Sequence, residues 1–294
     1  MNLGIETYIP QRQEPMKLVS NEQLFSDLID FNDYCDQCSA MTRLSADLVN
    51  TLDNIRDIVR TVKKHPSAES LAVIESIFQD LKGNVSYETL KEKGKKILGT
   101  IVEGFRRVIK ALKGLWERML NMIPTVRNRL NALQEKIRKL PSAQAKAIGT
   151  WSYHGIDIMK EAGGWKIMMD CTAEIINNSK SHTSESYRQY VSKKFATADI
   201  SVSGWLETTT ILHSAVKFID KTKPALDKDK AEVKKYEAAF KRAQNGDGDV
   251  DDMKATLHLA NLSLILNQIA YRTIIGTATS ILANCKIPQK STAK

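Results

Sequence analysis

Glycine and proline are scarce in this chain, with 14 glycines and 7 prolines among 294 residues. All-β sandwiches and barrels place both residues at their many turns, so this composition argues against them. The apolar content of 42% is too high for a disordered chain. Frequent leucine, alanine, lysine and glutamate favour helices. The sequence therefore predicts an all-α fold.

Cysteines and long apolar runs are also few. Four cysteines are too few for a disulfide framework in a chain of this size, so we expect a reducing compartment. Cys35 and Cys38 offer only two of the four ligands of a closed zinc site, and their place on an apolar helical stripe predicts buried packing side chains. The most apolar stretch, residues 262–285, is interrupted by two amides and an arginine. It predicts a buried helix rather than a membrane span.

Recognisable catalytic and metal-binding motifs are missing. The five histidines include no pair at i, i+4, and the sequence has neither a glycine-rich phosphate loop nor a Gly-x-Ser-x-Gly elbow. Residues 247–252 resemble the start of a calcium loop, but Asp252 and His258 stand where that loop needs glycine and glutamate. We therefore expect a protein that is not an enzyme and has no cofactor, metal or small-molecule substrate.

Helical periodicity divides the chain into three parts. Residues 1–19 predict an extended arm, residues 20–141 an elongated helical region that is acidic and then basic, and residues 142–294 a helical bundle. Pro124 is predicted to interrupt one helix and Pro224 to begin another. Residues 142–178 predict a helix weakened by glycines, and residues 250–285 the last helix. No pair of strands is expected.

Charge is unevenly distributed along the chain, whose net charge is +9. Residues 1–90 hold 8 basic and 14 acidic side chains, whereas residues 91–140 hold 14 basic and 4 acidic ones. The rest of the chain, residues 141–294, holds 21 basic and 16 acidic side chains. The excess of positive charge is therefore concentrated in one amphipathic stretch, which is the strongest functional signal in the sequence.

Three interpretations of this basic stretch stay open. It is a solvated helix face, a surface that neutralises nucleic-acid phosphates, or a helix at a membrane interface with Phe105, Leu115 and Trp116 in the lipid. Under the second or third interpretation, the side chains expected to contact phosphates or headgroups, without reading bases, are Lys95, Lys96, Arg106, Arg107, Lys110, Lys113, Arg127, Arg129, Lys136 and Lys139.

Four phrases of the sequence resemble internal head proteins of large tailed bacteriophages. They are SAESLAVIESI at 67–77, GTIVEGF at 99–105, VIKALKGLWE at 108–117 and RLNALQEKIRKLP at 129–141. An acidic helical part followed by a basic helix with tryptophan is similar to the phiKZ-like internal head family and to virion proteins of T4-like phages. The resemblance covers roughly residues 60–141.

This resemblance implies a non-enzymatic virion component that is made in the host cytoplasm and packaged inside the capsid with the genome. Its partners would be the packaged DNA, bound non-specifically, or capsid and other virion proteins, and it could be ejected with the genome. A maturation protease that cuts after a small-x-Glu phrase would cut after Glu69. The alternatives are a membrane-active helical protein that acts in genome delivery and a helical protein–protein adaptor.

Overall fold

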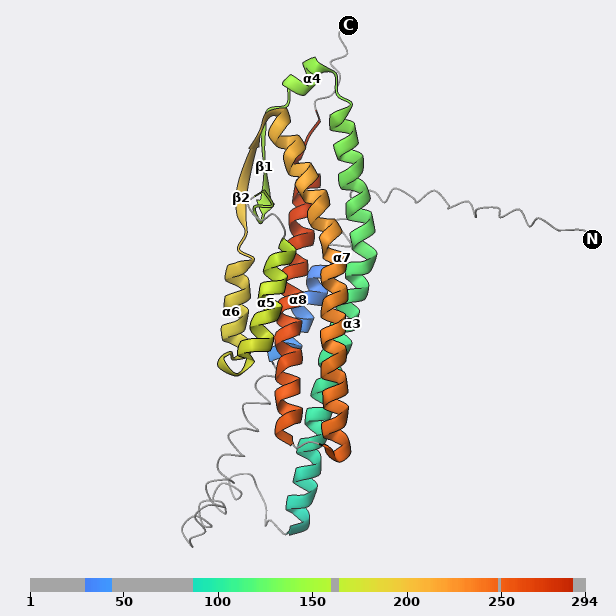
Figure 1. Cartoon of the computed structure of the whole chain (residues 1–294), viewed down its shortest axis with the longest axis vertical. Coiled ribbons are helices and arrows are strands. Elements are labelled where there is room, and N and C mark those ends of the chain that lie inside the picture. The colour runs from blue at the N-terminus through green and yellow to red at the C-terminus, as the bar shows by residue number, and fades with distance from the viewer. Residues whose placement is uncertain (1–29, 44–86, 160–163, 248–249, 288–294) are drawn as a thin grey trace, which may run out of the picture.

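Three long helices form the body of the molecule. The computed structural model describes residues 30–43, 87–159, 164–247 and 250–287. Within these ranges α3 (Tyr87–Arg138), α7 (Gly204–Arg242) and α8 (Val250–Asn284) run side by side along the long axis (Figure 1). The shorter α5 (Gly164–Asn178) and α6 (Ser184–Lys194) pack on the side of α8 away from α3. The all-α prediction is confirmed.

Small elements connect these helices. They are α4 (Ser142–Lys146), β1 (Thr150–Gly155), the 3-10 turn η1 (Ser179–Ser181), β2 (Ala198–Ser203) and the π-helical turn η2 (Ala243–Asp247). Residues 30–43 are also helical, and they lie against the long helices although they precede α3 in the chain (Figure 1).

The antiparallel pair β1–β2 was not predicted from the sequence, which indicated a helix over residues 142–178 and no strands. In β1 the side chain of Tyr153 is buried while its neighbours Ser152 and His154 are exposed, which is the period of two expected of a half-buried strand. Trp151 faces Val202 across the pair. The two strands are far apart in the chain, so no hairpin turn marks them in the sequence.

Pro124 and Pro224 both lie inside continuous helices, α3 and α7, so the predicted breaks at these residues are wrong. A proline inside a helix removes one backbone hydrogen bond and strains the preceding turn. Both prolines lie on the exposed side. The apolar stripe of α3 continues into the core on either side, at Ile123 and Val126. Tertiary packing on both sides of the proline therefore outweighs its local preference.

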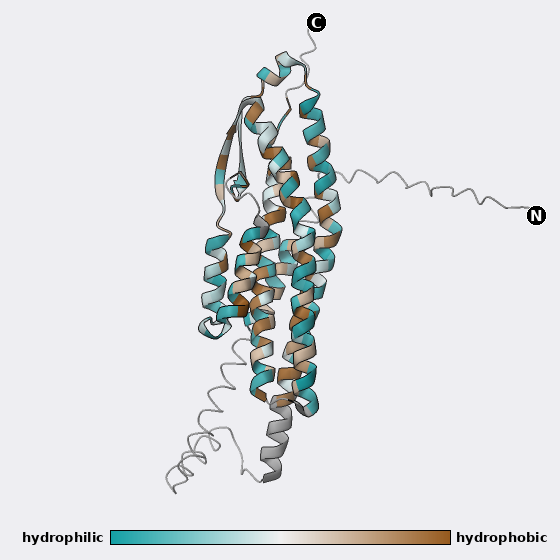
Figure 2. Cartoon of the chain, viewed as in Figure 1, coloured by the Kyte–Doolittle hydropathy of each residue, from teal (hydrophilic) through white to brown (hydrophobic). Residues whose placement is uncertain are grey.

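One hydrophobic core joins these elements, except α4 and η1, which have no buried side chains. Its buried side chains extend from Phe31 in the first helical segment to Cys285 after α8, and α3 packs against both α7 and α8. Figure 2 shows apolar and polar residues interleaved along the long helices, as expected of amphipathic helices that share a core. The boundary expected after Pro141 falls between α3 and α4, and the elements on its two sides share this core.

The helical segment 30–43 is fitted closely to α3. The Tyr34 hydroxyl donates a hydrogen bond to the carbonyl oxygen of Ala111 (3.2 Å), and the Arg118 guanidinium lies 4.3 Å from the centre of the Tyr34 ring. A Cβ atom added to Gly114 would overlap the Tyr34 Oη atom. The absence of a side chain at Gly114 therefore allows the tyrosine to reach the α3 backbone.

A buried carboxyl group lies between α7 and α8. Asp229 is 6% exposed, and the Tyr271 hydroxyl donates a hydrogen bond to its Oδ2 atom (3.0 Å). Burial raises the pKa of Asp229 to about 7, against the opposing effect of hydrogen bonds from Tyr271 and Thr172. The folded protein therefore retains a proton on Asp229 at a pH where an unfolded chain would release it.

Replacing Gly114 with alanine should destabilise the protein, because the new methyl group overlaps the Tyr34 hydroxyl. Overpacking of this kind costs about 1–3 kcal/mol. Gly99→Ala is the matched control, since a Cβ atom there meets nothing within 4 Å and alanine favours the helix. Denaturant unfolding should show Gly114→Ala to be less stable than Gly99→Ala, with partial recovery when Tyr34→Phe is added. Equal stability of the two variants would contradict the close fit.

Replacing Asp229 with asparagine should remove one component of the pH dependence of stability. Because the folded pKa is raised from 3.8 to about 7, this group favours the folded state below pH 3.8, and its contribution is lost as the pH rises toward 7. The free energy of unfolding of the wild type should therefore fall relative to that of Asp229→Asn by a few kcal/mol across this range, at about 1.4 kcal/mol per pKa unit. A constant difference between the two proteins from pH 4 to 7 would show that Asp229 is not protonated in the fold.

Candidate functional site: the basic face of α3

The apolar and basic side chains of α3 lie on opposite sides of the helix. Val108 and Leu112 belong to a fully buried stripe that faces the core. With 3.6 residues per turn, Arg106, Lys110 and Lys113 share the opposite side, and all three are exposed. Packing of the apolar stripe thus fixes which way the cations point.

The basic face of α3 comprises the exposed cations between residues 98 and 139, a range with ten basic and three acidic side chains. Eight of the predicted contact residues have described side chains, and all are exposed except the partly buried Arg129: Arg106, Arg107, Lys110, Lys113, Arg127, Arg129, Lys136 and Lys139. Lys95 and Lys96 lie in the first turns of α3, but their side chains are outside the described residues, as are Glu69 and the predicted arm at 1–19.

Two of these cations connect α3 to α7. Lys113 Nζ lies 2.7 Å from Glu237 Oε1, and Arg127 Nε lies 2.5 Å from Asp220 Oδ1. These acidic partners could not be predicted from the sequence, because they are about a hundred residues away in the chain and only the packing of α3 on α7 brings them close. These two cations are engaged by carboxylates of α7 and are therefore less available to a ligand.

Other cations of the basic face remain open to solvent. Arg107 pairs with Glu103 one turn away in α3, and an exposed pair of this kind is weak. Four cations form no ion pair with any residue in the described ranges: Arg106, Lys110, Lys136 and Lys139. Within the described ranges, unneutralised positive charge thus lies in two places along α3, at Arg106 and Lys110 and, roughly 40 Å away, at Lys136 and Lys139.

A cleft of about 580 Å³ lies beside Arg106 and Lys110, between α3 and α7. Its wall includes the rings of Phe105 and Phe240, which stack with their centroids 3.9 Å apart. Arg106, Lys110 and Lys241 also line the cleft, together with the acidic Glu117 and Glu237. The cleft therefore combines an apolar wall with charged side chains of both signs.

The apolar residues that the membrane interpretation places in lipid are packed inside the protein. Phe105, Leu115 and Trp116 are 6%, 0% and 5% exposed. The Trp116 indole Nε1 atom donates a buried hydrogen bond of 2.7 Å to the Oδ1 atom of Asn267 on α8. Within the described ranges, no helix is long and apolar enough to cross a bilayer.

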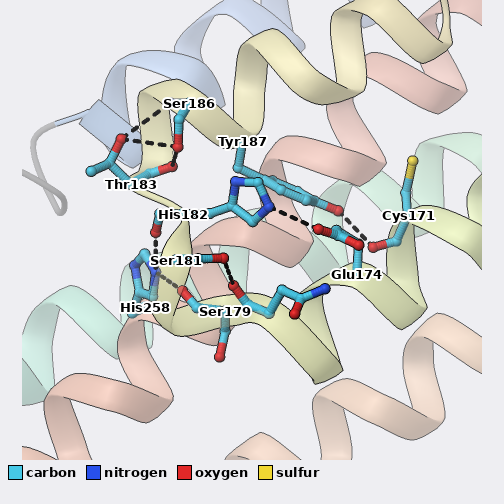
Figure 3. A network of polar contacts seen from close by, with 10 residues as sticks. Cys171, Glu174, Ser179, Ser181, His182, Thr183, Ser186, Tyr187 and His258 are labelled. Carbon is cyan, nitrogen blue, oxygen red and sulfur yellow. Dashed lines mark hydrogen bonds and ion pairs between the residues drawn. The ribbon is translucent and has the colours of Figure 1, made fainter.

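Histidines form a polar network between α5, α6 and α8 that the sequence did not reveal (Figure 3). His182 Nε2 lies 3.1 Å from Glu174 Oε1, and this hydrogen bond lowers the pKa of Glu174. His258 Nε2 lies within hydrogen-bond distance of two carbonyl oxygens, those of Ser179 (3.1 Å) and His182 (2.9 Å). These contacts hold the η1 turn against α8, which is a structural role.

The buried thiols have the environment of packing side chains. Cys35, Cys38 and Cys171 are each at most 1% exposed and free of disulfides. Burial raises the pKa of Cys35 and of Cys171 to about 12, so the reactive thiolate is disfavoured. Among the residues that the structure describes, no three potential ligands are grouped to hold a metal ion.

Comparison with known proteins gives one match. No curated protein and no solved structure matches the chain. Residues 48–150, a range that contains all of α3 and its basic face, match the family model of phiKZ-like phage internal head proteins. This match covers about a third of the chain and confirms the resemblance to this family seen in the sequence.

Proposed function

We propose that this protein is a phage internal head protein, that it is packaged with the genome, and that it binds DNA without sequence specificity through the basic face of α3. The supporting observation is the set of exposed cations that lack an ion pair in the described part of the chain, on a helix whose other side is fixed in the core. Lysine and arginine side chains displace the counterions condensed on phosphates and need no base contacts to do so.

The geometry of the helix suits backbone contact along a duplex. At 1.5 Å per residue, the span from Arg106 to Lys139 is roughly 50 Å long. A straight helix of this length spans more than one turn of DNA, about 34–36 Å, so cations toward its two ends can contact phosphates of successive turns without entering a groove. Because only four of its cations lack an ion pair within the described ranges, the expected binding is weak and sensitive to salt. Weak binding of this kind is compatible with release of the protein alongside the ejected genome.

The two alternatives make different demands on the structure. A membrane-active role would require Phe105, Leu115 and Trp116 to leave the core, at the cost of the buried hydrogen bond of Trp116. A protein–protein adaptor could use the cleft between α3 and α7, but nothing in its lining selects a particular protein. Phosphate neutralisation uses the exposed side chains as they stand.

Binding of duplex DNA to the full chain should weaken with salt. The slope of the logarithm of the binding constant against the logarithm of the salt concentration should report the number of phosphate contacts. The variant Arg106→Gln/Lys110→Gln/Lys136→Gln should reduce that slope by about 3, since each phosphate contact contributes about 0.9. Fluorescence anisotropy with unrelated duplexes of equal length measures this and should show no sequence preference.

The matched control is Lys166→Gln/Lys180→Gln/Lys193→Gln, which removes the same charge from α5, η1 and α6, across the bundle from α3 (Figure 1). It should keep most of the wild-type slope. Equal loss in both triple variants would assign binding to net charge alone. Absence of DNA binding at low salt would overturn the proposal, and the adaptor role would then be the one to test.

A further inference from the structure

A second cluster of positive charge lies away from α3. Arg43, Arg188 and Arg272 line one cleft of about 350 Å³, although they come from the helical segment 30–43, from α6 and from α8. No residue of α3 lines this cleft. It is therefore separate from the basic face described above.

The charges of this cleft do not balance within its lining. One carboxylate, Asp36, faces the three guanidinium groups and pairs with Arg272 at 2.8 Å. Burial, and after it the positive charge of Arg43, lowers the pKa of Arg188, while Glu185 on the same helix opposes this effect. Arg43 and Arg188 thus repel each other across a cleft that an anion could occupy.

The cleft also contains a buried amide. Gln268 is 2% exposed, and its Oε1 atom accepts a hydrogen bond of 2.9 Å from the Ser39 hydroxyl. Its Nε2 atom is shielded from solvent. Burial raises the pKa of the neighbouring Cys38 thiol, and a hydrogen bond with the Gln268 side chain opposes this rise. The amide is therefore paired within the protein, and the arginines are the groups that an oxyanion in the cleft would contact.

We infer that this cleft binds a single phosphate group, held by Arg43, Arg188 and Arg272. Guanidinium groups match the geometry of phosphate oxygens through paired hydrogen bonds. Three such groups offer more donors than the two oxygens of a carboxylate can accept, whereas a phosphate has three or four oxygens. Within the lining of the cleft, three arginines face one aspartate, so the net charge there is positive.

The phosphate group could belong to a free phosphate or to a DNA backbone, and the binding chemistry is the same. Inorganic phosphate is the first probe, since its binding does not depend on the basic face of α3. At matched ionic strength, millimolar phosphate should raise the melting temperature of the full chain above that in chloride or acetate. Calorimetric titration should then give a one-to-one stoichiometry.

Arg188→Gln should weaken phosphate binding at least tenfold, because it removes the half-buried guanidinium at the centre of the cluster. Arg43→Gln tests the same site at an exposed side chain, so a defect there cannot be attributed to a disturbed core. The matched control is Arg242→Gln, which makes the same change on the exposed side of α7 and should bind phosphate as the wild type does.

A short DNA duplex added to the phosphate titration distinguishes the two sources. If the duplex competes with phosphate and Arg43→Gln weakens the competition, the cleft takes a backbone phosphodiester. If phosphate binds and the duplex does not compete, the cleft takes a free phosphate. Three results would each overturn the inference. They are no binding of phosphate, an equal rise in melting temperature in acetate, and phosphate binding that is unchanged in both Arg188→Gln and Arg43→Gln. None of these results depends on the α3 variants that test DNA binding.

Discussion

Burial of the apolar stripe of α3 against α7 and α8 determines the rest of this structure. The stripe runs from Ile101 to Ile137, and its side chains are almost completely removed from solvent. Each large aliphatic side chain buried in this way contributes roughly 1.5–3 kcal/mol. Because the two sides of a helix are fixed relative to each other, this burial also sets the direction of every cation on α3. Stability and electrostatics therefore depend on the same helix.

Polar groups in the core restrict how these helices can pack. Trp116 and Asn267 join α3 to α8, and Asp229 and Tyr271 join α7 to α8. A shift of one helix along another would separate these partners and leave buried polar atoms unsatisfied, which costs about 1–3 kcal/mol for each group. Apolar stripes alone would tolerate several alignments. The buried hydrogen bonds thus favour one register of the bundle.

The sequence predicted what depends on local periodicity and not what depends on distant partners. The last helix was expected at 250–285 and is observed at Val250–Asn284, because its apolar residues recur at helical spacing. The exposed cations of α3 followed from the same periodicity. The β1–β2 pair and the acidic partners Glu237 and Asp220 could not be predicted, since tertiary contacts create them. The helix break expected from the low helix propensity of proline does not occur at Pro124, because packing on both sides maintains the helix.

The docking of the segment 30–43 changes what proteolysis would do to this protein. Phe31, Cys35 and Cys38 are buried in the shared core, and Tyr34 is hydrogen-bonded to the α3 backbone. A cut after Glu69 would leave two polypeptides whose association does not need the peptide bond between them. The acidic N-terminal piece would then stay with the basic helix as a non-covalent heterodimer. Cleavage and loss of residues 1–69 would then be separate events. Mass spectrometry would detect two polypeptide masses in denaturant and one complex under native conditions.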